Sequence, residues 1–417
     1  MTVSIPDLTR AFLRIGCLSF GGPAGQIAMM HREVVDTHKW LTEKEYLSAL
    51  SFCMLLPGPE AMQLATWIGW RMHGTLGGLI AGLLFVLPGA VVVLALSVVF
   101  ATLGDLPLVS ALFFGLQAAV VAVVIEALLR VAKRALKGRA QWVIAGLAFV
   151  GLFVLNLLFP LIIAAAGLWG LFTARPTATP LPAAPPNAMA LSLRAIAVWG
   201  AVWLVPLGLL VWLEGGLLAD LGIYFSKLAV LTFGGAYAVL AWMAQEVVQV
   251  QGWLTLPEMM TGLGLAETTP GPLILVTQFV GFLAAFKAAG VWYGLAGAVV
   301  TLWMTFAPCF LWIFAGAPWL ARLTAMPRLA GALAAITAAV VGVIANLSLW
   351  FAAHVFFGQI GQISAGPLHM IQPDISTINV PAVAIAIGAA WLLLGRHWNM
   401  IVVLALAALA GAATAMF

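Results

Sequence analysis

Residues 12–59 read FLRIGCLSFGGPAGQIAMMHREVVDTHKWLTEKEYLSALSFCMLLPGP, and residues 225–272 read FSKLAVLTFGGAYAVLAWMAQEVVQVQGWLTLPEMMTGLGLAETTPGP. The second stretch follows the first at a constant shift of 213 residues, and 18 of the 48 aligned positions are identical. This identity exceeds chance even for an apolar composition, so the chain contains an internal duplication. In a membrane protein, a repeat of this size is typical of a transporter built from two related halves.

The composition places the chain in a lipid bilayer. Hydrophobic residues make up 64% of its 417 residues, charged residues 8%, and the mean hydropathy is +1.12, values far from those of soluble domains. The net charge of +4 fits basic residues in cytoplasmic loops, so no nucleic-acid partner is expected. Apolar runs of about the length that crosses a membrane lie near 75–103, 108–131, 140–158, 159–173, 195–213, 290–318, 329–353, 379–394 and 398–416. The sequence predicts an all-α polytopic membrane protein.

The duplication divides the chain into two homologous halves. Residues 1–173 form the first transmembrane half, and residues 217–417 the second. Between them, residues 174–194 are a proline-rich linker, and residues 195–216 form an extra transmembrane helix with no counterpart in the first half. One extra crossing can invert the second half relative to the first.

Basic residues in equivalent loops support this inversion. The loop at 132–141 carries four Lys or Arg residues, whereas its counterpart at 354–378 has none. The loop at 104–108 has none, whereas its counterpart at 321–328 carries two. By the positive-inside rule, the halves have opposite orientations and form an inverted-topology repeat.

Two pairs of apolar segments are broken by glycine and proline. They are 8–30 with 46–70, and 221–245 with 259–285. The distribution of basic residues favours helices that enter and return on the same side over helices that span fully. Between about 9 and 13 spanning helices fit the length criterion.

The Phe-Gly-Gly and Pro-Gly-Pro motifs predict these breaks, because proline lacks a backbone donor and glycine permits turns that other residues resist. Each break leaves a helix N-terminus with unpaired N–H groups and partial positive charge, which binds anions. Simple kinks are the alternative, but both motifs recur in both halves at the same spacing. The substrate-binding candidates are the motifs and the glutamines that follow them: Phe20, Gly21, Gly22, Pro57, Gly58, Pro59, Gln63, Phe233, Gly234, Gly235, Pro270, Gly271, Pro272 and Gln278.

A basic residue is also duplicated. Arg14 aligns with Lys227, each six positions before its Phe-Gly-Gly motif. A charge in an apolar stretch costs about 2.5–3.5 kcal/mol on insertion scales, so it faces the bundle interior or reaches towards an interface. Snorkelling to the interface is the simpler explanation for Arg14. Both residues are nevertheless substrate-binding candidates, because two cations suit a doubly charged anion.

Two acids are duplicated as well. Glu33 and Glu246 are candidates for carrying a coupling proton, since a low-dielectric site raises the proton affinity of a carboxyl group, but a structural role is equally open. Glu60 and Glu267 flank the breaks and are the next proton-coupling candidates.

The remaining polar groups receive structural interpretations. The repeated Trp-Leu-Thr-x-x-Glu pattern predicts that Glu45 and Glu258 close capping boxes. An ion pair within one helix is expected between Glu126 and Arg130. The cysteines, with no paired spacing, are interpreted as small core residues, and the histidines of the 31–44 loop as solvated. No metal site, cofactor or catalytic residue is expected.

The motifs together resemble the chromate ion transporter family. The first half carries the resemblance in Phe20-Gly21-Gly22-Pro23, Glu33-Val34-Val35, Trp40-Leu41-Thr42, Leu56-Pro57-Gly58-Pro59, Gln63 and Ile68-Gly69. The second half resembles the homologous domain of two-domain members in Thr232-Phe233-Gly234-Gly235, Glu246, Trp253-Leu254 and Thr269-Pro270-Gly271-Pro272. Ala236 stands where the first copy has Pro23, so the two breaks need not be equivalent.

The resemblance implies a multi-pass protein of the bacterial inner membrane that exports chromate, driven by the proton-motive force as in an antiporter, and so confers chromate resistance. The sequence leaves open a transporter that takes up or exchanges sulfate or another oxyanion and, less favoured, an intramembrane enzyme. The expected partners are chromate or sulfate, protons and the lipid bilayer. The oligomeric state stays open, with a homodimer as one option.

Overall fold

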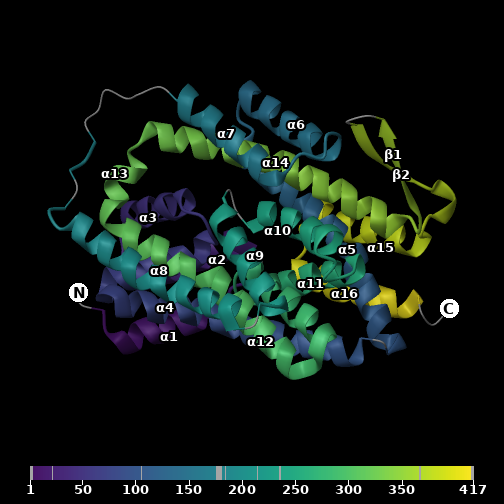
Figure 1. Ribbon diagram of the computed structural model, residues 1–417, viewed down its shortest axis with the longest axis horizontal. Helices are drawn as coiled ribbons and strands as arrows, with labels where there is room; N and C mark the ends of the chain where they lie inside the picture. The colour runs from purple at the N-terminus through teal and green to yellow at the C-terminus, as the bar shows by residue number, and fades with distance from the viewer. Residues whose placement is uncertain are drawn as a thin grey trace. The chain divides into compact units, whose positions relative to one another are not determined.

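The computed structural model describes residues 3–20, 22–104, 106–174, 181–183, 185–213, 215–233, 236–365 and 368–414. The chain forms two compact units, and each unit takes segments from both halves of the duplication. Figure 1 labels the helices and strands of the described residues. The first unit contains Met1–Ala101, Arg175–Ala236 and Leu265–Ala330. The second contains Thr102–Ala174, Tyr237–Gly264 and Gly331–Phe417.

The first half of the chain is helical throughout its described elements. In order these are α1 (Ile5–Leu18), α2 (Gly22–His31), the π-helix η1 (Arg32–Thr37), α3 (Glu43–Leu55), α4 (Glu60–Leu103), α5 (Pro107–Ala135), α6 (Arg139–Phe153) and α7 (Phe159–Thr173). Helix α8 (Ala188–Leu213) lies where the extra helix was predicted at 195–216, but it begins earlier, so residues 188–194 of the predicted linker are helical.

The second half repeats the order of the main helices and adds several short helices and a β-hairpin. Its elements are α9 (Leu217–Leu231), α10 (Ala236–Gln245), the π-helix η2 (Glu246–Val250), α11 (Leu256–Thr268), η3 (Leu273–Leu275), α12 (Val276–Gly316), η4 (Ala317–Trp319), α13 (Leu320–Thr324), α14 (Pro327–Phe356), η5 (Ile375–Thr377), α15 (Val380–Ala390), η6 (Trp391–Gly395) and α16 (Met400–Thr414). After α14, an antiparallel hairpin of β1 (Ile360–Ala365) and β2 (Leu368–Pro373) pairs Ile360 with Pro373. The sequence predicted only a loop there.

The prediction of an all-α polytopic membrane protein is confirmed. Within the described residues, five helical segments are long and apolar enough to cross a membrane: Glu60–Leu103, Pro107–Ala135, Ala188–Leu213, Leu273–Thr324 and Pro327–Phe356. Shorter apolar helices occupy the other predicted runs at Arg139–Phe153, Phe159–Thr173, Val380–Gly395 and Met400–Thr414.

The chain reverses direction between α1 and α2. Arg14 lies four residues before the end of α1, and Glu33 eleven residues after the start of α2, so along a continuous rod they would be more than about 20 Å apart. Instead, Arg14 Nη1 is 3.4 Å from Glu33 Oε1. The two helices therefore fold back on each other.

A second reversal separates α3 from the first part of α4. Glu45, near the start of α3, is 3.8 Å from Arg71, eleven residues into α4, and only a turn at Pro57-Gly58-Pro59 brings them together. The chain reverses again at Gly74, where the helical backbone is interrupted. These reversals are compatible with the re-entrant interpretation, which stays a prediction.

Several local predictions are confirmed and one is wrong. Thr42 and Glu45 form a complete capping box, and the Thr255 N–H donates to Glu258 Oε2 at 2.6 Å. Arg130 donates to Glu126, one turn earlier in α5. Of the cysteines, Cys53 and Cys309 are buried as expected, but Cys17 of α1 is exposed.

Candidate functional site

The breaks of the two halves meet crosswise within the first compact unit. Gly58 of the first Pro-Gly-Pro motif donates its backbone N–H to the carbonyl oxygen of Thr232 at 2.8 Å, one residue before Phe233. Gly271 of the second motif donates to the carbonyl oxygen of Ser19 at 3.1 Å, one residue before Phe20. Since Ser19 and Thr232 are equivalent in the repeat, the structure makes the same contact twice.

Glycine is required in both of these contacts. Gly58 and Gly271 have φ angles of +120° and +88°, which L-residues with a Cβ adopt only with strain. At Gly89 in α4, a Cβ would lie 2.1 Å from the carbonyl oxygen of Pro270. The second break is therefore held by close backbone packing as well as by its hydrogen bond.

Buried glutamines surround these contacts. Gln26 of α2 donates to the carbonyl oxygen of Gly271 at 2.5 Å, and Gln63 of α4 donates to that of Pro57 at 2.6 Å. Gln278 is also buried, with 4% of its surface exposed. Each primary amide has two N–H groups, so Gln26 keeps one for another acceptor, whereas Gln63 also hydrogen-bonds the Cys309 thiol.

The two duplicated cations, Arg14 and Lys227, have different surroundings in the structure. Arg14 is exposed and forms an ion pair with Glu33, whose side chain is only 5% exposed. His38 Nε2 lies 3.7 Å from the other oxygen of the same carboxyl group. Lys227 is also exposed, but it makes no ion pair within the described part of the chain. The aligned positions therefore carry the same charge in different surroundings.

The four predicted acids also lie in different places. Glu33 is buried, whereas Glu246 is half-buried and accepts a hydrogen bond from Gln251 at 3.5 Å. Near the breaks, Glu60 is half-buried and Glu267 is buried. Phe20 and Phe233 are half-buried beside their breaks, while Gly22, Pro59 and Pro272 are buried. Gly21, Gly234 and Gly235 fall outside the described residues, as do residues 175–180 of the linker.

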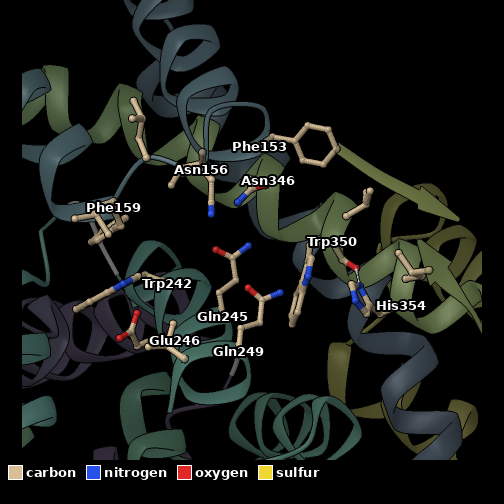
Figure 2. A pocket seen from close by; sticks show the side chains of 16 residues that line it. Phe153, Asn156, Phe159, Trp242, Gln245, Glu246, Gln249, Asn346, Trp350 and His354 are labelled. Atoms are coloured by element: carbon tan, nitrogen blue, oxygen red, sulfur yellow. Dashed lines mark hydrogen bonds between the residues drawn. The ribbon is translucent and has the colours of Figure 1, made fainter. Parts of the chain in front are cut away.

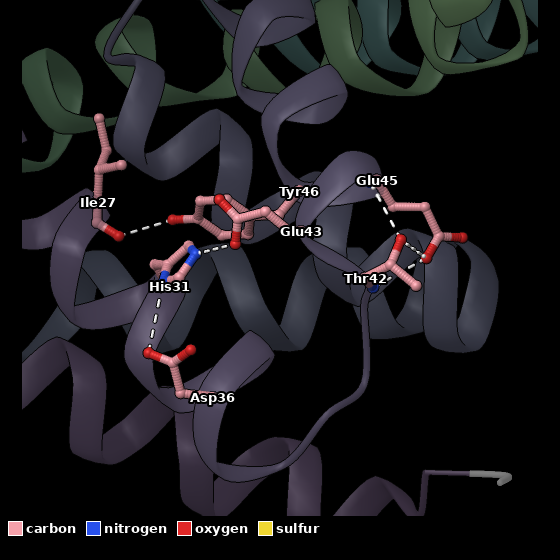
Figure 3. Close-up of polar contacts among 7 residues, drawn as sticks. All are labelled: Ile27, His31, Asp36, Thr42, Glu43, Glu45 and Tyr46. Atoms are coloured by element: carbon pink, nitrogen blue, oxygen red, sulfur yellow. Dashed lines mark hydrogen bonds and ion pairs between the residues drawn. The ribbon is translucent and has the colours of Figure 1, made fainter.

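The polar segment between α2 and α3 forms a tight side-chain cluster (Figure 3). His31 Nε2 is 2.5 Å from Glu43, and its Nδ1 is 3.5 Å from Asp36. The Tyr46 hydroxyl donates to the carbonyl oxygen of Ile27 at 2.6 Å. The hydrogen bond to Glu43 raises the pKa of His31 above its ordinary value. The expectation that His31 is merely solvated is wrong, because two carboxylates hold it.

A cavity of about 350 Å³ lies entirely within the second unit (Figure 2). Its wall includes Glu246 and Gln249 of η2, Trp242 and Gln245 of α10, Asn156, and Asn346, Trp350 and His354 of α14. Trp242 stacks on Phe159 with ring centroids 5.3 Å apart, which fixes one side of the wall. The duplicated acid Glu246 thus opens onto a polar cavity.

The model of the chromate transporter family matches residues 6–171 and 219–412, which are most of the chain. The chain belongs to this family. The two matched regions correspond to the two halves of the duplication, and the family is one of transporters.

Curated relatives of this chromate transporter family member cover most of its length. A chromate transport protein from Pseudomonas aeruginosa is 32% identical over 98% of this chain and 92% of its own. One from Cupriavidus metallidurans is 29% identical over 82% of this chain and 81% of its own. A probable chromate transport protein from Synechococcus elongatus is 28% identical over 82% and 83%, respectively. No solved structure matches significantly.

The sequence did not predict every residue at the crossed breaks of this transporter family member, nor the wall of its cavity. Ser19, Thr232 and Gln26 lie beside the named motifs, and a polar residue next to each break was an available signal. The wall of the cavity was also missed. Asn346, a polar residue within the apolar run 329–353, was the clearest pointer to it.

Proposed function

We propose that this protein exports chromate across the bacterial inner membrane, coupled to the proton-motive force, and thereby gives resistance to chromate. The structural observation that supports the proposal is the crosswise meeting of the two Pro-Gly-Pro motifs with the residues before the two Phe-Gly-Gly motifs. The substrate is suggested by its relatives, which are named chromate transport proteins.

The chemistry of the crossed breaks suits a tetrahedral dianion. Helices α2 and α4 begin there, and the first N–H groups of a helix have no partner within it. The remaining amide N–H group of Gln26 adds a neutral donor in a buried setting. Arg14 and Lys227, near the ends of α1 and α9, attract the anion towards the breaks.

The membrane potential favours outward transport of this substrate. Moving one charge across 100 mV is worth about 2.3 kcal/mol, so the two negative charges of chromate gain about 4.6 kcal/mol on leaving a cell that is negative inside. Export therefore draws directly on the electrical part of the proton-motive force.

Inside-out membrane vesicles provide the test. Energised vesicles that contain the protein should accumulate chromate, and a proton ionophore should abolish accumulation. Gly271→Ala should abolish it too, because φ at this position is +88°. Gly200→Ala is the matched control, since a Cβ there meets nothing within 4 Å.

Competition and a charge variant complete the test. Accumulation of sulfate in place of chromate would assign the protein to sulfate, and movement of neither would refute the proposal. Lys227→Ala should abolish chromate accumulation while the amount of protein in the membrane stays the same. Normal accumulation by this variant would remove Lys227 from the site.

A further inference from the structure

The cavity of the second unit contains few ionisable groups. Of its sixteen lining residues, only Glu246 and His354 titrate. The amide side chains of Asn156, Gln245, Gln249 and Asn346 are the other polar groups on the wall, along with the indole N–H groups of Trp242 and Trp350 (Figure 2). None of the described residues that line the wall is a lysine or an arginine.

A cavity wall of this composition disfavours binding of the transported anion. The carboxylate of Glu246 repels a dianion, and no lysine or arginine among the described lining residues offsets this repulsion. Amides and indoles, in contrast, hold water through neutral hydrogen bonds. A volume of about 350 Å³ accommodates about ten water molecules at about 30 Å³ each.

His354 provides a second proton acceptor. Its Nδ1 lies 2.8 Å from the carbonyl oxygen of Trp350, and since a carbonyl only accepts, Nδ1 carries the hydrogen. In the neutral ring, Nε2 therefore has a free lone pair. Two proton acceptors on α14 and η2 thus share one polar cavity, with Gln245 and Gln249 between them in the view of Figure 2.

The backbone around Glu246 supports a functional position. Glu246 begins the π-helix η2, and single π-turns are frequent at functional sites. Its duplicate Glu33 also lies in a π-helix but is buried against Arg14 and His38. Of the two duplicated acids, Glu246 is therefore the one whose carboxyl group is open to exchange.

We infer that this cavity is an aqueous vestibule in which hydronium exchanges protons with Glu246, so that Glu246 is the acid that carries the coupling proton. Hydronium transfers its proton to the carboxylate and leaves as water, and the neutral acid gives the proton up in the reverse step. The inference rests on the proposed proton coupling, and it selects one acid from the four candidates.

Cysteine labelling tests the vestibule without reference to transport. In a Cys17→Ser background, which leaves only buried cysteines, Gln249→Cys should react with a charged, membrane-impermeant thiol reagent from one side of the membrane only. Val247→Cys, fully buried on the same π-helix, is the matched control and should not react. Failure of the Gln249→Cys variant to react from either side would overturn the vestibule.

Proton movement tests the role of Glu246. Chromate transport by the wild type should move protons and should vary with pH. The Glu246→Gln variant should lose both properties, and Glu246→Asp should restore them. The Glu33→Gln variant should keep both properties. A Glu246→Gln variant that still moves protons would overturn the inference alone. A wild type that transports chromate without moving protons would instead refute the proposed coupling, and with it this role of Glu246.

Discussion

The two copies of the Glu-Val-Val segment share one backbone and differ in their surroundings. In each, a π-turn closes from the residue five positions on to the duplicated acid, His38 N to Glu33 O at 3.0 Å and Gln251 N to Glu246 O at 2.9 Å. In each, the next residue has positive φ, 53° at Lys39 and 62° at Gly252. The duplication therefore preserved the conformation through considerable sequence change.

The side chains around this backbone differ in charge between the two copies. Where the first copy has His31, Asp36 and His38, the second has Ala244, Gln249 and Gln251. The first copy therefore has an ion-paired cluster where the second has uncharged side chains, of which Gln249 lines the cavity. The first copy thus closes its acid within a network that stabilises the fold, and the second leaves its acid open for chemistry.

The largest difference in stability between the two copies should appear when their duplicated cations are replaced. Arg14→Ala leaves the buried carboxylate of Glu33 without its arginine, and we expect a loss of about 1–3 kcal/mol of stability, below the cost for fully buried pairs because Arg14 is exposed. Lys227→Ala should change stability little. Thermal unfolding in detergent measures both, and equal losses would show that the two copies are not divided in this way.

The sequence predicted the parts of this molecule that depend on local pattern. Run length and hydropathy located the spanning helices, and Phe-Gly-Gly and Pro-Gly-Pro located the breaks, because these features act within a few residues of where they occur. The capping boxes were predictable for the same reason, since Thr42 and Glu45 are only three residues apart.

Contacts that depend on chain reversal could not be predicted in the same way. The pairing of Arg14 with Glu33 needs a turn between α1 and α2, and the bond from Gly58 to Thr232 joins residues from the two different halves. The β-hairpin was missed because residues 360–373 carry little apolar alternation and follow a long helix. The cavity was missed because its walls come from segments far apart in the chain, from Leu152 to Ile371, so that no local pattern marks them.

The next largest difference should be in the pH dependence of stability, because the first copy has His31 where the second has Ala244. Since the pKa of His31 is raised in the folded protein, its hydrogen bond to Glu43 stabilises most at pH below 6.5 and is lost as pH rises through the raised pKa. His31→Ala should cost about 1–2 kcal/mol at low pH and flatten the dependence. Melting curves from pH 5 to pH 8 measure this, and an unchanged slope in the variant would assign the dependence to other groups.

The capping boxes should respond alike, because here the copies agree. Thr42→Ala and Thr255→Ala each remove the side-chain oxygen that accepts a helix N–H, from Glu45 at 3.3 Å and from Glu258 at 3.4 Å. Each substitution should cost about 1 kcal/mol. Thermal unfolding of the two variants and of the double variant measures the losses, which should add because the sites share no partner. Clearly unequal losses would mean that the helices α3 and α11 contribute differently to folding.

The smallest effect should come from exchanging the residues with positive φ. Lys39 adopts φ of 53° although it has a Cβ, and its duplicate is Gly252, where a Cβ would meet nothing within 4 Å. Lys39→Gly relieves left-handed strain of about 1 kcal/mol but adds chain entropy to the unfolded state, so a net gain of about 0.5 kcal/mol is expected. Gly252→Lys should lose a similar amount, because it adds the strain without a steric clash. A small rise in melting temperature for Lys39→Gly and a small fall for Gly252→Lys would show that the fold imposes this conformation in both copies. A fall for Lys39→Gly would instead show that the Lys39 side chain itself stabilises the first copy.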